Sequence, residues 1–216
     1  MSTRKNNLLV PCCWLTLAAG LAGCQAIGAA AYKFSGPAAV EAKYPLGTQP
    51  VLVMVEKFEN PAAAALDSEQ LGHFLQEELR QHTTTPVVDQ SKLTDLKAAK
   101  GPAYREMKVQ EVGRAVGAAQ VLYVDLVEDS VDATAGGELL KGTVAVRVKV
   151  VDATSGATLW PTDMSNGFPM RMETPYNRQS RQITQDSMRR ELMRGMAERV
   201  GRLFYKWKPD EEEKPE

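Results

Sequence analysis

The chain has very little histidine and lacks the common motifs of catalytic sites. Its 216 residues include only 2 histidines, His73 and His82. Their spacing corresponds to about two and a half helical turns, so on a helix they point to opposite faces and cannot share a metal ion. No Gly-x-Ser-x-Gly elbow, phosphate-binding loop or dinucleotide fingerprint is present. We therefore expect no metal site, no cofactor and no catalytic residue.

An excess of charge of either sign is also absent. Lys and Arg together number 26 and Asp and Glu number 27, which gives a formal net charge of -1 at pH 7. Electrostatic binding of nucleic acid requires an excess of cations, so we expect no nucleic-acid partner. Apolar residues are not scarce. They make up 44% of the chain, which is enough for the core of a globular domain.

Cysteine is scarce and is confined to the N-terminal segment. The 3 cysteines are Cys12, Cys13 and Cys24. In this segment two cationic residues precede a short apolar run, which ends in small residues. A cationic start, a short apolar run and a small-residue cleavage site are the parts of a secretory signal. Because the apolar run is too short to span a bilayer, we expect a signal peptide at residues 1–23.

The sequence Leu-Ala-Gly-Cys at positions 21–24 resembles the lipobox of bacterial lipoproteins. The resemblance implies cleavage between Gly23 and Cys24 and lipidation of Cys24, which anchors the protein to a lipid bilayer. Two or more acyl chains give stable anchoring, whereas one gives only marginal binding. Cleavage also removes the other two cysteines, so no disulfide is expected. Gln25 follows Cys24, where enterobacterial lipoproteins of the inner membrane have Asp, so the resemblance favours the outer membrane.

The rest of the chain divides by composition. The segment after Cys24 is rich in Ala and Gly, contains prolines and has no sustained period, which is typical of a tether. The last residues are charged and contain proline, which is typical of a disordered tail. The expected parts are a signal peptide at 1–23, a lipidated tether at 24–50, an α/β domain at 51–208 and a disordered acidic tail at 209–216.

The first half of the domain is expected to alternate strands and helices. Continuous apolar runs, such as residues 51–55, are typical of strands buried on both faces. Asp67 and Ser68 are good N-cap residues for a helix that ends near His82. The expected strands are 51–55, 85–89 and 121–124, and the expected helices start near 68, 91 and 107.

The second half begins with a clear alternation. Valines at the even positions from 144 to 150 alternate with Ala145, Arg147 and Lys149, which is typical of a strand with one buried face. A turn cluster at 152–156 predicts an antiparallel hairpin that ends at Trp160. The even-numbered valines are expected to point inward, because a register slip of one residue exposes them and buries the cations.

The C-terminal part is expected to be less regular and then helical. Gly and Pro residues between positions 164 and 175 favour an irregular segment or a short edge strand. A long helix is expected at 177–207, with an apolar stripe formed by Met188, Leu192, Met196, Val200 and Leu203. The fold class expected is α/β, a mixed sheet of about five strands with helices packed on it.

Three segments resemble a known superfamily of envelope proteins. Residues 112–124 place a Gly-Ala step between a helix and a buried strand, 144–152 is the alternating strand, and 154–160 reads Thr-Ser-Gly-Ala-Thr-Leu-Trp. They resemble the superfamily of the curli secretion lipoprotein CsgG, the penicillin-binding-protein activator LpoB and the TolB N-terminal domain. The resemblance implies the fold and the envelope location. Residues 128–141 lack the ten-residue alternating strands of pore-forming hairpins, so no pore is expected.

Two groups of residues are candidates for an interaction surface. The first group is methionines, whose thioethers are soft and adapt to a contacting surface. The second group is arginines of the C-terminal helix, and their abundance indicates a solvated face or a contact with membrane or cell wall. The candidates are Met164, Met170, Met172, Arg189, Arg190 and Arg194.

Several aspartates, including Asp89, Asp125, Asp152 and Asp163, follow expected strands, where both turn-forming and catalytic carboxylates occur.

The function expected from these features is that of a membrane-anchored envelope lipoprotein. Its domain is expected in the periplasm, where it acts without catalysis as a binding or scaffold module for another envelope protein. The alternative is a periplasmic hydrolase that acts on cell wall or lipid through Asp89 or Asp125.

Overall fold

The computed structural model describes residues 38–58, 65–134, 136, 138–178 and 183–209. Cys24 and the expected signal peptide lie outside these residues. The chain forms two compact units. In the smaller unit, the backbones of Val40 and Trp207 pair with each other through N···O distances of 2.8 and 3.1 Å. The larger unit, residues 41–206, contains the helices and strands named below.

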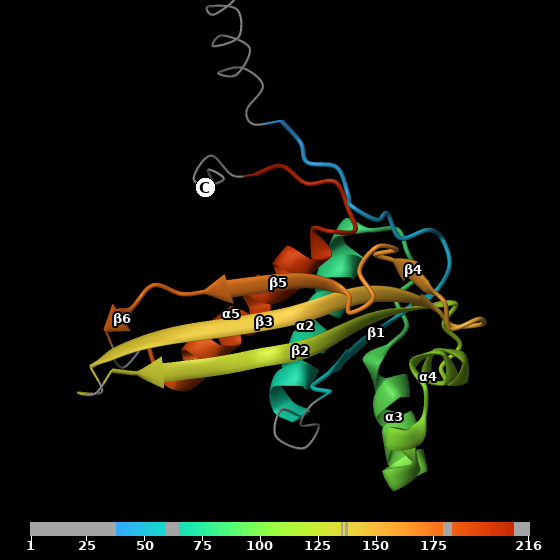
Figure 1. Ribbon diagram of the computed structural model, residues 1–216, viewed down its shortest axis with the longest axis horizontal. Helices are drawn as coiled ribbons and strands as arrows, with labels where there is room; N and C mark the ends of the chain where they lie inside the picture. The colour runs from blue at the N-terminus through green and yellow to red at the C-terminus, as the bar shows by residue number, and fades with distance from the viewer. Residues whose placement is uncertain (1–37, 59–64, 135, 137, 179–182, 210–216) are drawn as a thin grey trace, which may run out of the picture. The chain divides into compact units, whose positions relative to one another are not determined.

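The larger unit is an α/β fold with a six-stranded mixed sheet, which confirms the fold class (Figure 1). Its strands are β1 (Val51–Glu56), β2 (Gln120–Ala133), β3 (Leu139–Asp152), β4 (Thr158–Trp160), β5 (Phe168–Glu173) and β6 (Asn177–Arg178). Its helices are α2 (Ala65–His82), α3 (Gln90–Lys100), the 3-10 helix η1 (Gly101–Glu106), α4 (Val109–Ala115) and α5 (Gln185–Gly201). Among the described residues, no helix is both long and apolar enough to cross a membrane.

Strand β3 organises the sheet, because it is hydrogen-bonded along both of its edges. On one side it pairs antiparallel with β2, which in turn pairs parallel with β1. On the other side it pairs antiparallel with β4, β5 and β6. The expected hairpin of β3 and β4 is therefore confirmed, and the segment around position 170 is the short edge strand β5.

The β2–β3 hairpin is longer than the sequence analysis expected. Both strands have 14 residues and extend into the segment 128–141, where they cover 128–133 and 139–141. The greater length depends on strand pairing and helix packing, which the local sequence does not show. The polar half of β2 pairs with β3, as in Asp129 with Val144, and α5 packs closely on β3 at Gly142. A Cβ atom at this glycine would lie 2.3 Å from Leu192 Cδ1, so a larger residue would displace the Leu192 side chain.

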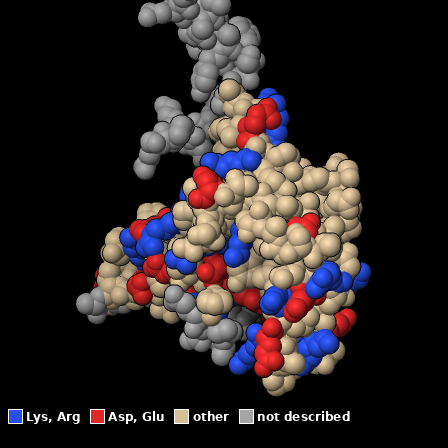
Figure 2. Space-filling view, turned by 45° about the vertical axis from the view of Figure 1, so that its right-hand side comes forward, with Lys and Arg blue, Asp and Glu red and all other residues tan. Residues whose placement is uncertain are grey.

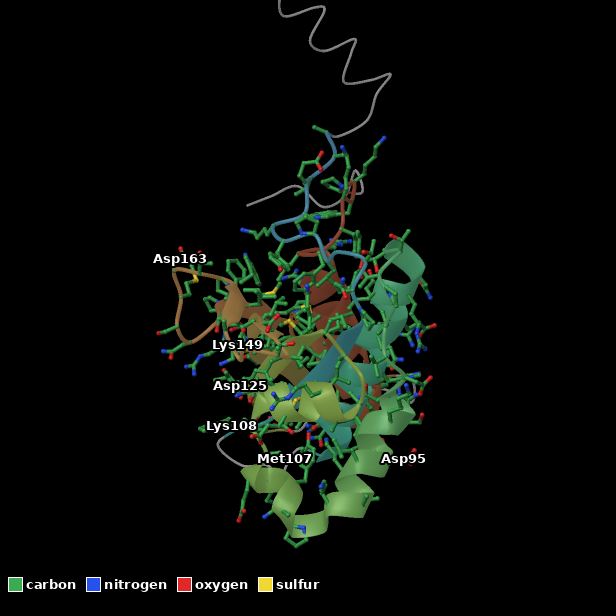
Figure 3. All side chains as sticks on the ribbon, turned by 90° about the vertical axis from the view of Figure 1, so that its right-hand side faces the viewer. Asp95, Met107, Lys108, Asp125, Lys149 and Asp163 are labelled. Carbon is green, nitrogen blue, oxygen red and sulfur yellow. The ribbon has the colours of Figure 1, made fainter. Side chains whose placement is uncertain are left out.

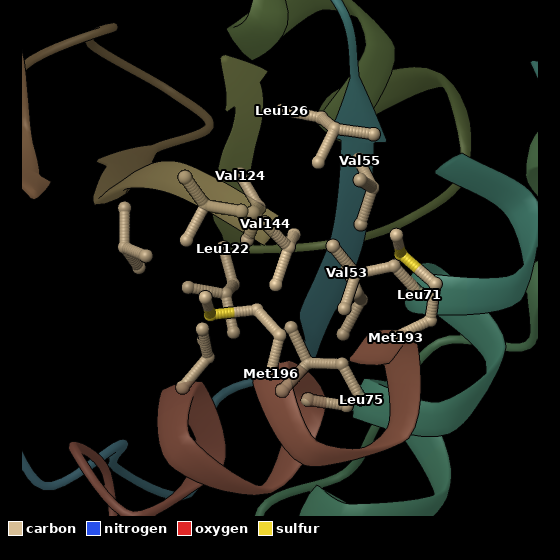
Figure 4. Close-up of a cluster of buried hydrophobic side chains, with 14 of the residues drawn as sticks. Val53, Val55, Leu71, Leu75, Leu122, Val124, Leu126, Val144, Met193 and Met196 are labelled. Atoms are coloured by element: carbon tan, nitrogen blue, oxygen red, sulfur yellow. The ribbon is translucent and has the colours of Figure 1, made fainter. Parts of the chain in front are cut away.

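Helices α2 and α5 cover one face of the sheet and form the main core with it (Figures 1 and 4). The even-numbered valines of β3 point into this core, as predicted, and Val146 is 1% exposed. Figure 4 shows Leu75 of α2 and Met196 of α5 beneath the strand side chains. The expected apolar stripe of the C-terminal helix is also confirmed. Its members Met188, Leu192, Met196 and Val200 are buried, and Leu203 is buried too but follows the end of α5 at Gly201.

The opposite face of the sheet is covered only beside β1 and β2. There Leu93 of α3 and Val112 of α4 form a second cluster with Leu52 and Val121 of the strands. On the same face, the described helices do not cover β5 or the part of β3 around Arg147, which is exposed. We call this uncovered part of the sheet the open face.

Several expected element boundaries were wrong. Residues 85–89 do not form a strand but a single parallel bridge between Val87 and Val51, because Pro86 has no N–H to extend the pairing. The expected N-caps Asp67 and Ser68 lie inside α2. The C-terminal helix does not begin at 177 but at Gln185, where the Thr184 side chain accepts a hydrogen bond from Ser187 N at 3.1 Å.

Part of the expected tether packs on the domain. Tyr44 and Leu46 contact the main core, and Tyr44 N donates a hydrogen bond to Leu203 O at 3.0 Å. Residues 41–50 therefore belong to the larger unit.

The facing of β3 gives a test of the fold. We expect Val146→Asp to lower the free energy of unfolding by about 3 kcal/mol, because it places an unpaired charge in the core. Arg147→Gln is the matched control, because its side chain is exposed, and we expect a change within about 0.5 kcal/mol. Urea denaturation followed by circular dichroism measures both. Equal destabilisation by the two variants would contradict the inward facing of Val146.

Candidate binding site

A pocket of about 720 Å³ lies at the carboxyl end of β1, beside the first part of β2, which pairs with β1 and contributes Tyr123. In open α/β sheets, ligands bind in the crevice outside the carboxyl ends of the strands. The wall opposite the strands is built from α3, η1 and the start of α4. Lining residues with polar or aromatic side chains include Glu56, Gln90, Lys97, Tyr104, Tyr123 and Lys149.

Glu56 is the half-buried carboxyl of this pocket. It is the last residue of β1, and the parallel register places it beside Asp125 of β2. The Tyr104 hydroxyl donates a hydrogen bond to Glu56 Oε1 at 2.9 Å. Burial raises the pKa of Glu56, against the lowering effects of the Tyr104 hydrogen bond and the Lys97 charge. The nearby charge of Asp125 adds a smaller rise in this pKa.

Two tyrosines flank this carboxyl, and each carries a lysine over its ring. Lys97 Nζ lies 5.3 Å from the ring centre of Tyr104, and Lys149 Nζ lies 5.2 Å from that of Tyr123. These are cation–π distances. Burial, followed by the charge of Glu56, raises the pKa of both tyrosines, so their hydroxyls stay protonated and can donate hydrogen bonds.

Asp89 and Asp125, the carboxylates singled out from the sequence, have different places. Asp89 is the N-cap of α3 and accepts a hydrogen bond from Ser91 N at 2.9 Å. This bond lowers the pKa of Asp89. Asp125 lies beside Glu56, and its side chain accepts a hydrogen bond from Phe58 N at 3.1 Å. Only Asp125 is therefore brought next to the pocket carboxyl.

The other polar candidates have structural partners or lie elsewhere. Asp152 holds its turn by accepting hydrogen bonds from the backbone N–H groups of Thr154 and Ser155. Asp163 lies on a loop away from Asp125 (Figure 3). His82 stacks on the Tyr205 ring with ring centres 4.6 Å apart. Among the described residues, no group of three or more His, Cys, Asp or Glu side chains is suited to hold a metal ion.

The predicted Met and Arg candidates do not form one surface. Met170 and Met172 are half-buried and pack against the main core, whereas Met164 is 38% exposed. Arg189 forms an ion pair with Asp67 at 3.0 Å. Arg194 lies over the Phe74 ring, and Arg190 is exposed on α5. Figure 2 shows cations and anions interspersed on the face that it presents, without a large area of one sign.

Sequence reasoning missed most of the pocket. Glu56 had a usable signal, because it directly follows an apolar run typical of a parallel strand, and such strand ends line ligand sites. Tyr104 had no comparable signal, because η1 begins with Gly101 and Pro102, and such a pair indicates a turn or a helix end and not a ligand site. Figure 3 shows Met107, Lys108 and Lys149 on the same side of the molecule, although they are far apart in the sequence.

The raised pKa of Glu56 gives a pH test. Because the folded-state pKa lies above its ordinary value of 4.5, the contribution of Glu56 to stability is complete below that pH and is lost as pH rises through the folded value. Glu56→Gln mimics the protonated form at every pH. We expect the stability of the wild type, relative to Glu56→Gln, to fall as pH rises above 4.5, as measured by urea denaturation. Exposed Glu69→Gln is the control, and a relative stability that rises with pH would contradict the assignment.

No protein-family model matches the chain, and no curated protein is significantly similar to it. Among solved structures, lipoprotein GNA1162 from Neisseria meningitidis is similar at 12% identity and a TM-score of 0.44, over 70% of this chain and 97% of that chain. The PelC dodecamer from Paraburkholderia phytofirmans is similar at 12% identity and a TM-score of 0.36, over 77% and 96% of the two chains. Uncharacterized lipoprotein B from Nitrosomonas europaea is similar at 11% identity and a TM-score of 0.39, over 75% and 84%. Similarities at this level do not assign the chain to a family, and its resemblance to the CsgG, LpoB and TolB superfamily stays a prediction.

Proposed function

We propose that this protein is a lipid-anchored lipoprotein of the bacterial envelope, and that its domain binds another envelope protein without catalysing a reaction. The observation that carries the proposal is the Leu-Ala-Gly-Cys sequence at positions 21–24, which ends a segment that resembles a secretory signal. Lipidation of Cys24 places the domain at a membrane surface, in the periplasm and preferentially at the outer membrane. Because residues 41–50 pack on the domain, at most residues 25–40 separate it from the lipidated Cys24, so the domain acts close to the bilayer.

The open face of the sheet supports a binding role. It has a shallow hollow of about 280 Å³, whose lining includes Val127, Arg147, Pro169 and Arg171. Val127 is 37% exposed, which places an apolar side chain among charged ones. An apolar centre with a charged rim is the usual composition of a protein–protein contact. Because the strands are fixed by their pairing on both edges of β3, this surface is rigid before a partner binds.

Hydrolysis is the second candidate, and the Glu56 and Asp125 pair favours it. Two carboxyls with different surroundings can act as general acid and general base. Burial raises the pKa of Glu56, which keeps a proton available to higher pH. A hydrolytic activity that is lost in Asp125→Asn, with folding intact, would replace the binding proposal. Asp89 is no longer a candidate for this role, because its carboxylate caps α3.

Anchoring is tested by metabolic labelling with palmitate. We expect label on the wild-type protein and none on Cys24→Ala, because the thiol of Cys24 is the acyl acceptor in the lipoprotein pathway that this sequence resembles. Intact mass of the labelled protein should also show loss of residues 1–23. An unlabelled wild-type protein of full mass would overturn the lipoprotein assignment.

Partner binding is tested by a photo-crosslinking residue at Val127. We expect an adduct with an envelope protein in cells, and we expect Arg147→Glu to abolish it by reversing a charge next to the hollow. The same crosslinker at Lys92, which is exposed on α3, is the control and should give no such adduct. An adduct that persists unchanged in Arg147→Glu would contradict binding at the open face.

A further inference from the structure

Positive charge is in excess in the pocket at the carboxyl end of β1. Four of its basic side chains have no ion-pair partner among the described acidic residues: Lys97, Arg105, Lys108 and Lys149. Among the described residues, the acidic side chains in the lining are Glu56 and Glu69. Glu56 is already hydrogen-bonded to Tyr104, and burial disfavours its charged form. A ligand that balances this lining therefore carries negative charge.

The size and lining of the pocket indicate more than an inorganic anion. A volume of about 720 Å³ is that of a site for a small organic molecule. Apolar groups from Met54, Met107, Val109 and Val151 line it beside the two tyrosines. A single phosphate or chloride leaves these groups without contacts, so the ligand needs a body with apolar faces as well as an acid group.

Uncharged polar groups complete the lining. Gln90, Gln110 and Thr158 come from α3, α4 and β4. Gln90 Oε1 is buried and has no hydrogen-bond donor among the described residues. A buried acceptor without a donor is costly, and the cost is removed when a ligand or a water supplies one. Hydroxyl groups on the ligand body are suitable donors for amide and hydroxyl acceptors of this kind.

We propose that the pocket binds a small anionic saccharide, a sugar ring that carries a carboxylate or phosphate group. The acid group lies between Lys97 and Lys149, which reach the pocket from α3 and β3. The sugar ring packs against the tyrosine and methionine side chains. Its hydroxyls form hydrogen bonds with the side-chain amides of Gln90 and Gln110. The choice of a sugar rests on the proposed envelope location, where acidic sugars are present, whereas the need for an anion rests on the pocket alone.

The test uses three sugars that share one ring and differ in their acid group. N-acetylglucosamine is neutral, N-acetylmuramic acid carries a carboxylate, and N-acetylglucosamine 1-phosphate carries a phosphate. Isothermal titration calorimetry on the full chain in non-ionic detergent, with detergent alone as a blank, measures their binding. We expect at least one acidic sugar to bind about tenfold or more tightly than the neutral one, because a charge-assisted hydrogen bond is added. The acidic sugar that binds more tightly shows whether the pocket prefers a carboxylate or a phosphate.

Variants connect binding to the pocket. Lys149→Gln should lower the affinity for the acidic sugar about tenfold. Lys149→Arg keeps the charge and should retain most of this affinity. Lys92→Gln, on the same helix as Lys97 but outside the pocket, is the matched control and should not change binding. Circular dichroism confirms that each variant is folded.

Three results would overturn the proposal. They are equal binding of neutral and acidic sugars, unchanged affinity in folded Lys149→Gln, and no binding of either acidic sugar at millimolar concentration. The lipoprotein proposal can fail independently of the sugar proposal. Cys24→Ala separates the two, because it lacks the acyl acceptor but retains the pocket. We expect this variant to bind the acidic sugar like the wild type.

Discussion

The two-sided pairing of β3 is the constraint on which the rest of the structure depends. A strand hydrogen-bonded on both edges cannot shift its register, so its alternation fixes what lies on each face of the sheet. The even-numbered valines complete the core with α2 and α5. The odd positions place Arg147 on the open face and Lys149 in the pocket. Core, open face and pocket are therefore set by one strand.

The parts of the fold that the sequence predicted are those with a strong local period. The buried run at 51–55, the valines of β3 and the stripe of α5 follow from spacing alone. The outer half of β2 has no such signal, because Glu128, Asp129 and Asp132 are polar. It is a strand because β3 pairs with it. Pocket residues were missed for a related reason, since Glu56 and Tyr104 meet only when distant elements pack.

Buried charges join the helical layer to the long hairpin. Asp67 of α2 pairs with Arg189 of α5, and Asp129 of β2 pairs with Lys57, which follows β1. Burial raises the pKa of Asp67, and the neighbouring Asp129 raises it further, against the lowering effect of Arg189. Such pairs contribute little net stability after desolvation. Removal of one member leaves a charge without its partner, so alternative packings of α2 and α5 are disfavoured.

Strand β5 ends one side of the sheet, and its composition limits aggregation. An unpaired strand edge is a template on which another chain can add a strand. Pro169 has no N–H to offer such a chain, and Arg171 and Glu173 place charges along the strand. The lipid anchor proposed at Cys24 would confine molecules to two dimensions and raise their local concentration, which favours collisions between edges. The protected edge would then let many copies crowd on one membrane without their sheets fusing.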